Sequence, residues 1–217
     1  MAEINLLDRL PQVKRDPKAR AALKSAADRA IAKRFDKDFF DGERRHGYGG
    51  YRYDGRWLPV ARRFVEHYGL KSDARILDVG AAKGFLMFDF LQVLPGATVR
   101  GLDVSVYAKQ NAHGGMGPLI DIGSADKLPY PDKSFDLVVS INSIHNLELA
   151  KCKTALQEME RVSGANEFVT VDAWRTDEEH QRLLDWILTA ETYLSVDDWH
   201  RLFAEVGYTG DAWWFIP

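Results

Sequence analysis

The sequence lacks paired cysteines, long apolar runs and an excess of basic residues. Its single cysteine, Cys152, excludes a disulfide framework and a cysteine-based metal site. No run approaches the ~18 apolar residues of a membrane-spanning helix, and the opening residues MAEINLLDRLPQ have no apolar signal core. The 29 Lys and Arg residues face 32 Asp and Glu residues, whereas nucleic-acid-binding proteins are typically basic. We therefore expect a cytoplasmic protein that binds neither a membrane nor nucleic acid.

The residues that are present suit one folded core. A hydrophobic content of 46% over 217 residues can bury a single sizeable core. Apolar residues at helical spacing predict one helix over residues 17–34 and another over 57–69, ending at Gly69. Between them, the stretch RRHGYGGYRYDGRW at 44–57 has neither a helical nor a strand pattern. We expect residues 1–70 to form an N-terminal helical extension and residues 71–217 to form the core domain.

From residue 75 onward, short apolar runs alternate with helical segments. The strand candidates are RILDV, ATVRGLDV, PLIDIGS, SFDLVVSI, NEFVTVDAW and the final DAWWFIP, and a long helix is predicted over 149–162. This alternation is typical of an α/β fold with a doubly wound, mostly parallel sheet. In such a sheet, ligands bind beyond the C-terminal ends of the strands, where the strand order reverses. The residues that follow each strand are therefore the candidates for a site.

The first strand candidate runs into the turn Gly80-Ala81-Ala82-Lys83-Gly84 and then into a helix. Glycines allow a tight turn and a close approach to a ligand, and the N-terminus of a helix offers free N–H groups. A dinucleotide fingerprint needs glycine at positions 80, 82 and 85, but Ala82 and Phe85 occupy the last two. This mismatch argues against NAD as the ligand.

Three segments together resemble class I S-adenosylmethionine-dependent methyltransferases. ILDVGAAKG resembles the first motif of this family, an acidic residue followed by G-x-G-x-G, with Ala82 in place of the middle glycine. Asp103, 19 residues after Gly84, resembles the family's acidic residue that binds both ribose hydroxyls. GSADKLPYPDKSFDLVVS resembles the acidic loop before the fourth strand, in a form common among small-molecule enzymes of the ubiquinone-biosynthesis type. Each segment alone could be a plain turn or a helix cap, but their order favours a binding site.

The resemblance implies a Rossmann-like sheet and S-adenosyl-L-methionine as the cofactor. The expected strand order is 3-2-1-4-5-6, in which the last strand could be antiparallel. This final strand candidate carries Trp213, Trp214 and Phe215, which could be buried in a homodimer. The cofactor contacts that the resemblance implies are Asp78, Gly80, Ala82, Lys83, Gly84, Asp103, Val104, Ala125, Asp126 and Ser140.

The residues after the fourth strand candidate are predicted to form the reacting centre. His145 could act as a general base, because an unperturbed imidazole has a pKa of ~6.5, or it could pack on the following helix. Asn142 could position a polar nucleophile or close the turn. Asn146 and Asp172 are predicted to line the acceptor pocket. The other histidines show no metal-ligand spacing, so we expect no metal.

Residues 44–57 are predicted to form a lid over the acceptor site. In this family, N-terminal segments fold over the cofactor and supply part of the acceptor pocket. Four arginines in the stretch face one acidic residue, Asp54, which predicts an acceptor with a carboxylate or phosphate group. An ordered surface loop packed on the sheet edge is the alternative. The acceptor contacts predicted here are Tyr48, Tyr51, Arg52, Tyr53, Arg56 and Trp57.

The sequence thus predicts an enzyme that transfers a methyl group from S-adenosylmethionine to a small, anionic or polar metabolite. A methyltransferase acting on tRNA or protein is the first alternative. A non-catalytic nucleotide-binding protein, or an NAD oxidoreductase on the same sheet, is the second. The segment SINS after the fourth strand lacks the Pro-Pro-aromatic motif of amino-methylating nucleic-acid enzymes, and Cys152 lies within a predicted helix, where a catalytic nucleophile is not expected.

Overall fold

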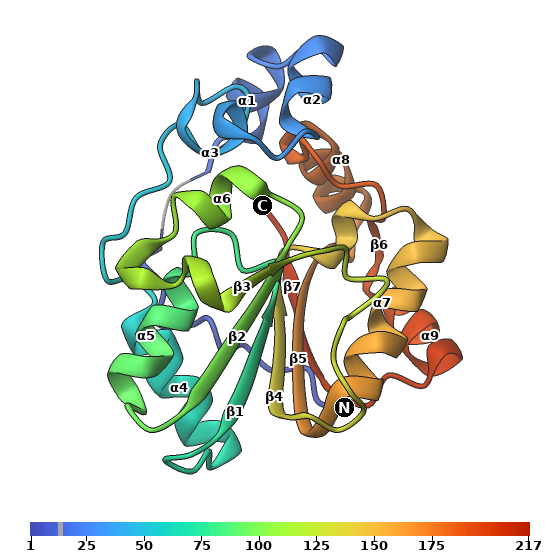
Figure 1. The fold of residues 1–217 in the computed structure, drawn as a ribbon. Coiled ribbons are helices and arrows are strands. Elements are labelled where there is room, and N and C mark those ends of the chain that lie inside the picture. Colours follow the sequence, from blue (N-terminus) through green and yellow to red (C-terminus); the bar gives the residue numbers. More distant parts are fainter. Residues whose placement is uncertain (13–14) are drawn as a thin grey trace.

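Seven parallel strands form one central sheet in the computed structural model, which describes residues 1–12 and 15–217. The strands are β1 (Arg75–Val79), β2 (Thr98–Asp103), β3 (Ile120–Ile122), β4 (Phe135–Ile141), β5 (Ser163–Trp174), β6 (Leu194–Ser195) and β7 (Asp211–Phe215). Their order is β3-β2-β1-β4-β5-β6, with β7 also paired to β5 (Figure 1). The predicted doubly wound α/β fold is confirmed.

Helices cover both faces of the sheet (Figure 1). The core helices are α4 (Leu58–Tyr68), α5 (Phe85–Val93), α6 (Val106–Gln110), α7 (Leu149–Val162), α8 (Asp177–Trp186) and α9 (Val196–Val206), with short 3-10 turns at His113–Gly115, Gly117–Leu119 and Ile144–Asn146. α4 and α5 pack together on one face, and α7 and α9 pack together on the other. Because β1 and β4 are covered on both faces, they are apolar along most of their length.

The helix α4 is packed into the core, although it lies in the predicted N-terminal extension. The ring of Phe64 meets that of Phe168 of β5 edge-on, with 5.0 Å between the centroids, and it also contacts Phe90 of α5. Phe64 is fully buried. The helix ends at Gly69, which adopts φ 59°, as the sequence predicts.

Residues 15–57, which we call the cap segment, lie over the C-terminal ends of the strands (Figure 1). The cap segment contains α1 (Pro17–Ala22), α2 (Ala26–Ala32), α3 (Lys37–Asp41) and the loop 42–57. The single helix predicted over 17–34 is wrong, because a capping box starts a new helix at Ser25. The Ser25 hydroxyl accepts the N–H of Asp28 at 3.2 Å, and the Asp28 carboxylate accepts the N–H of Ser25 at 2.7 Å.

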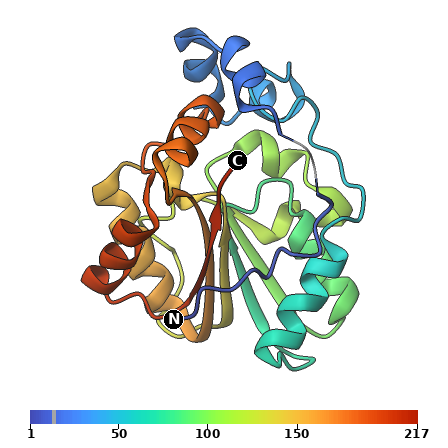
Figure 2. The ribbon, with the colours of Figure 1, turned by 180° about the vertical axis from the view of Figure 1, so that it is seen from behind.

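The C-terminal strand β7 lies beside β5 and is parallel to it, from Phe168↔Asp211 to Asp172↔Phe215. β7 thus occupies the sixth position of the predicted strand order, beside β5. The two-residue β6 pairs with the last residues of β5, Ala173 and Trp174. The N-terminal residues run along β7 (Figure 2), where the N–H of Ile4 donates to the carbonyl of Ala212 at 3.0 Å. Trp214 is only 4% exposed. Trp214 is thus covered within the chain, whereas Trp213 and Phe215 are part-buried and line the cavity.

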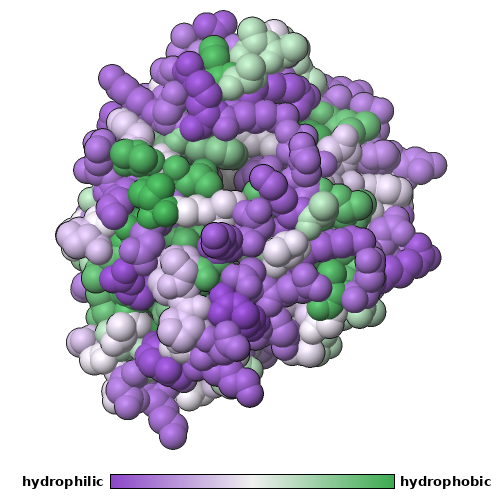
Figure 3. Space-filling view, turned by 45° about the vertical axis from the view of Figure 1, so that its right-hand side comes forward, coloured by the Kyte–Doolittle hydropathy of each residue, from purple (hydrophilic) through white to green (hydrophobic). Residues whose placement is uncertain are grey.

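The outer surface is mainly hydrophilic on the face shown in Figure 3, where hydrophobic side chains form small separate groups. The helix α8 is an example, because its first turn carries Asp177, Glu178 and Glu179, whose charges favour a helix N-terminus. Within residues 1–12 and 15–217, no helix has the length and apolar character needed to cross a bilayer.

Candidate active site

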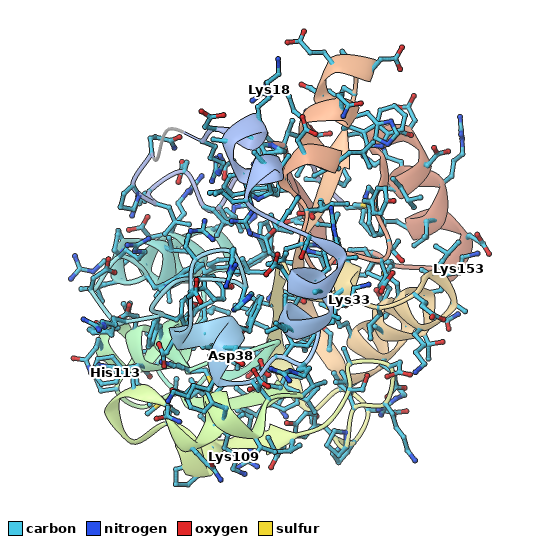
Figure 4. All side chains as sticks on the ribbon, turned by 90° about the horizontal axis from the view of Figure 1, so that it is seen from above. Lys18, Lys33, Asp38, Lys109, His113 and Lys153 are labelled. Atoms are coloured by element: carbon cyan, nitrogen blue, oxygen red, sulfur yellow. The ribbon has the colours of Figure 1, made fainter. Side chains whose placement is uncertain are left out.

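A cavity of about 1040 Å³ lies between the strand ends and the cap segment. The strands and the turns that follow them contribute Gly80, Asp103, Asn142 and Asp172 to its wall. The cavity is at the point where the strand order reverses between β1 and β4, which is where ligands bind in such sheets. Figure 4 looks down onto this end, where α2, with the labelled Lys33, crosses over the strands. Ligand pockets typically measure ~300–1000 Å³, so the cavity has room for two small molecules.

The turn after β1 reaches the cavity through residues with positive φ. Gly80 has φ 86°, and a Cβ at this position would lie 2.0 Å from Oγ of Ser143, so only glycine fits. Ala82 lines the cavity at φ 50°, a left-handed conformation that is costly for a residue with a Cβ. Gly84, at φ 71°, lies behind the wall and faces Met116, so its predicted direct contact with the cofactor has no geometric support.

Asp103, at the end of β2, fastens this turn. Its Oδ2 accepts the N–H of Ala82 at 2.7 Å, and its Oδ1 accepts the N–H of Ser105 at 2.8 Å. Burial raises the pKa of Asp103, and these N–H groups with that of Val104 oppose the shift. Because each carboxylate oxygen keeps a second lone pair, Asp103 can still accept hydrogen bonds from two neighbouring hydroxyls.

Asp78 of β1 is buried next to Asp103 and also lines the cavity. Burial, and then the charge of Asp103, raise the pKa of Asp78 to about 7. Near neutral pH this carboxyl group is therefore partly protonated, and it can donate a hydrogen bond as well as accept one.

Val104 and Ala125 provide apolar surface at the same end of the cavity. Asp126 does not reach the wall, because its carboxylate accepts a hydrogen bond from the hydroxyl of Ser124 instead. Ser124 itself lines the cavity. This end of the cavity fits an adenosyl group. The carboxylate of Asp103 and the close backbone of the turn suit the vicinal diol of the ribose, and the apolar residues suit the aromatic base.

On the far side of the cavity, His145 and Asp172 of β5 form a buried pair. Nδ1 of His145 accepts the backbone N–H of Asp172 at 3.2 Å, and Nε2 lies 3.6 Å from Oδ2 of the same residue. Nδ1 is therefore the unprotonated nitrogen, and the proton on Nε2 faces the carboxylate. Burial lowers the pKa of His145, although the charge of Asp172 opposes this. The imidazole is thus neutral, with its lone pair already engaged.

Asn142 and Asn146, on either side of this pair, also line the cavity. Asn142 adopts φ 51° and is exposed toward the cavity. Oδ1 of Asn146 is buried, and within the described residues it has no hydrogen-bond partner. Ser140 lies within β4, fully buried behind the wall, so its predicted contact with the cofactor is not supported. The Asn146 oxygen is thus an unsatisfied buried acceptor next to the cavity.

The loop of the cap segment brings five of its predicted contacts to the cavity, namely Tyr48, Tyr51, Arg52, Arg56 and Trp57. The ring of Tyr51 stacks on that of Phe85 at 4.6 Å and lies 4.2 Å from that of Tyr48. Tyr53 points elsewhere, because its hydroxyl donates to Asp89 at 2.6 Å and its ring stacks on His113. The aromatic residues of this loop therefore divide between the cavity wall and an anchor on α5.

Lys83, which the sequence predicts as a cofactor contact, does not line the cavity and pairs instead with Asp41 of α3 at 2.6 Å. Sequence reasoning missed several residues that the fold brings to this end of the sheet. Arg15, Arg20 and Lys24, in and beside α1, line the cavity. These basic residues alternate with alanines, as they do on many exposed helices, so no local sequence pattern predicts that they line a cavity. In the part of the chain that the structure describes, no cluster of His, Cys, Asp and Glu could hold a metal ion.

Residues 77–165 match the sequence profile of a family described as "Methyltransferase domain". The chain is 29% identical over 154 residues to a demethylmenaquinone methyltransferase of Symbiobacterium thermophilum, which covers 67% of this chain and 60% of that enzyme. It is 29% identical over 146 residues to a tRNA (carboxymethyluridine(34)-5-O)-methyltransferase of Arabidopsis thaliana, which covers 66% of this chain and 34% of that enzyme. The match thus spans less than two thirds of each relative.

The fold is also similar to that of solved structures. The YcgJ protein of Bacillus subtilis superposes with a TM-score of 0.55 at 19% identity, over 67% of this chain and 66% of that one. Likeness at this identity speaks for the arrangement of helices and strands and not for a particular reaction.

Proposed function

We infer the function from the match of residues 77–165 to a methyltransferase domain, together with the doubly wound parallel sheet. We propose that the protein transfers a methyl group from S-adenosylmethionine to a small, anionic or polar metabolite. One observation supports this most: one cavity is lined both by the carboxylate of Asp103, beside the turn after β1, and by the buried His145–Asp172 pair. We also propose that the enzyme is cytoplasmic, because Cys152 is a free, buried cysteine and disulfides are rare in that compartment.

The residues that would hold the cofactor are Gly80 and Ala82, through close backbone contact, and Asp103, through the ribose hydroxyls. When bound, S-adenosylmethionine supplies a methyl group on a good leaving group, so the protein mainly needs to align the acceptor and exclude water. The rings of Tyr48 and Tyr51 close the cavity from the cap segment. Aromatic faces also attract cations, which suits a sulfonium.

Asp172 is the group that we propose accepts the proton of the acceptor. His145 cannot take this proton directly, because the lone pair of Nδ1 is bound to a backbone N–H. Asp172 has free lone pairs, and burial raises its pKa, although His145 opposes the shift. A carboxylate with a raised pKa is a stronger base at neutral pH. His145 then acts as a positioning residue that orients Asp172.

The cap segment favours a small acceptor over a macromolecule. The cavity is bounded by side chains from α1, α3, the loop 42–57 and the strand ends, so an acceptor must enter beneath the cap. A tRNA or protein substrate would need this segment to move away. The chain carries no basic excess for a nucleic acid.

Calorimetric titration of the full chain with S-adenosylmethionine and, separately, with NADH tests the proposal. We expect saturable binding of S-adenosylmethionine and none of NADH. A mass-spectrometric screen for the demethylated cofactor, with mixed small metabolites or total tRNA as acceptors, then separates the two substrate classes. Binding of NADH alone would remove the proposed function, and turnover with tRNA alone would replace the small acceptor.

A further inference from the structure

Five basic side chains from the cap segment line the outer part of the cavity without a carboxylate partner. Two other arginines of the segment are paired, since Arg45 lies 3.6 Å from Asp28 and Arg56 lies 2.5 Å from Asp54. The unpaired set, as far as residues 1–12 and 15–217 show, is Arg15, Arg20, Lys24, Arg44 and Arg52. Within the described residues none of these five cations therefore forms an ion pair, although the carboxylate of Asp16 also lines the cavity.

Backbone carbonyls hold three of these side chains in place, those of Arg20, Lys24 and Arg44. Nε of Arg20 donates to the carbonyl of Trp186 at 2.8 Å, and Nζ of Lys24 donates to that of Asp185 at 2.7 Å. Both acceptors lie in the last turn of α8, whose exposed carbonyls favour cations. Arg44 donates to the carbonyl of Gly47 in its own loop. These bonds orient the side chains and leave their charges in place, with further N–H groups free to bind.

The charges are close enough to act on one another. Burial, and then the charges of Arg44 and Arg29, lower the pKa of Arg20 to about 10. Burial, and then the charges of Arg29 and Arg20, lower the pKa of Lys24 to about 8, and only Asp185 opposes this. Such crowding of like charges is unfavourable in the free protein, and an anion placed among them would relieve it.

We propose that this part of the cavity binds a phosphate or diphosphate group of the acceptor, with Arg20 and Arg44 as the main contacts. The proposal rests on the proposed function only in assigning the anion to the methyl acceptor. A carboxylate carries one negative charge, whereas a phosphate monoester carries about two, and a group of several cations suits the larger charge. The planar forks of arginine match phosphate oxygens in pairs. The acceptor is thus a phosphorylated metabolite, held by its phosphate at the mouth.

Titration calorimetry with pyrophosphate and with acetate, in about 100 mM salt to limit long-range effects, tests this without cofactor or turnover. We expect pyrophosphate to bind at least tenfold more tightly than acetate. Arg44→Gln and Arg20→Gln should each weaken pyrophosphate binding at least tenfold. Equal affinity for the two anions, or no binding of pyrophosphate, overturns the proposal.

Lys18→Gln is the matched control, because Lys18 lies on α1 beside Arg20 but is exposed and points away from the body of the protein in Figure 4. It should leave pyrophosphate affinity unchanged. If the cations had a purely structural role, Arg20→Gln would lower the unfolding temperature and leave the affinity for pyrophosphate at the wild-type value. That result would contradict the proposal. Since the guanidinium of Arg44 donates to a carbonyl of its own loop and not to α8, Arg44→Gln tests binding even where Arg20→Gln loosens α1.

Proton uptake gives a second readout. Sulfate does not titrate near neutral pH, so any proton taken up when it binds near pH 8 passes from the buffer to the protein. Binding should raise the pKa of Lys24, and calorimetry in buffers of different ionisation enthalpy should then detect uptake that Lys24→Gln removes. If S-adenosylmethionine fails to bind while pyrophosphate binds as expected, the proposed function fails and this subsite stands. The reverse result removes the subsite alone.

Discussion

Lys83, in the turn that faces the cofactor end of the cavity, forms an ion pair with Asp41 of the cap segment, 2.6 Å apart. Asp41 also accepts the hydroxyl of Tyr107 at 2.7 Å and the N–H of Tyr51 at 3.0 Å. Burial alone would raise the pKa of Asp41, but the hydrogen bonds from Lys83 and Tyr107 hold it below its ordinary value. One carboxylate thus joins the turn after β1, the helix α6 and the loop that closes the cavity.

Lys83→Met should loosen the cap segment. The Lys83 side chain is 8% exposed, so its loss leaves Asp41 without its nearest counter-charge, at an expected cost of ~1–3 kcal/mol in unfolding free energy. Amide hydrogen exchange in residues 41–57 should become at least tenfold faster. Lys153→Met is the control, because its pair with Glu205 lies at the surface and is worth ~1 kcal/mol or less. Unchanged exchange in the loop would show that other contacts hold it.

Asp103→Ala should weaken the binding of S-adenosylmethionine by about ten- to a hundredfold, because two hydrogen bonds to the ribose are lost, ~1–3 kcal/mol. The variant also frees the N–H of Ala82, so the turn itself should become more mobile. Asp136→Asn is a suitable control. Asp136 lies near the start of β4, at the opposite end of the sheet, where its carboxylate pairs with Arg75. Wild-type affinity in Asp103→Ala, measured by calorimetry, would exclude this carboxylate from the site.

Asp172→Asn should lower kcat by about a hundredfold or more, with little change in cofactor affinity, because a general base contributes ~10²–10⁴. The rate should rise with pH through the pKa of Asp172, which burial raises and the neighbouring His145 lowers. His145→Leu removes the Nε2–H group that faces this carboxylate. The acidic limb of the pH–rate profile should therefore move to higher pH in this variant. A limb that stays in place would mean that His145 does not act through Asp172.

Glu167→Gln should stabilise the protein at alkaline pH. Burial, and then the charge of Glu160, raise the pKa of Glu167 to about 8. Between the ordinary pKa and about 8, the folded state therefore binds more protons than the unfolded state, and stability falls as pH rises through this window. The variant should gain at least ~1 kcal/mol at pH near 8.5 and little near pH 4. Denaturant unfolding at both pH values measures this.

Glu148→Gln is the control for that series, because Glu148 is exposed and makes no side-chain cap hydrogen bond. Its unfolding free energy should stay within ~0.5 kcal/mol of the wild type at either pH. If Glu167→Gln behaves in the same way, the buried carboxyl group of Glu167 does not carry the predicted pH dependence.

Local patterns were enough to identify the sheet and several residues that line one end of the cavity. Strand, turn and helix follow one another within a few residues from Ile76 to Phe85, so burial period and glycine position can be read directly. Asp103 was found in the same way, as a carboxylate directly after a buried strand. The break between α1 and α2 was missed, because a capping box at Ser25 outweighed an apolar period that continues through it.

The parallel sheet, the turn at Gly80 and the carboxylate that follows β2 could be predicted, because each depends on residues that are neighbours in the chain. Tertiary packing places Asp172 beside both nitrogens of His145, pairs Lys83 with Asp41, and brings Arg15, Arg20 and Lys24, in and beside α1, to the cavity wall. These contacts join residues far apart in sequence. They depend on the packing of whole elements, which the spacing of residues along the chain does not encode.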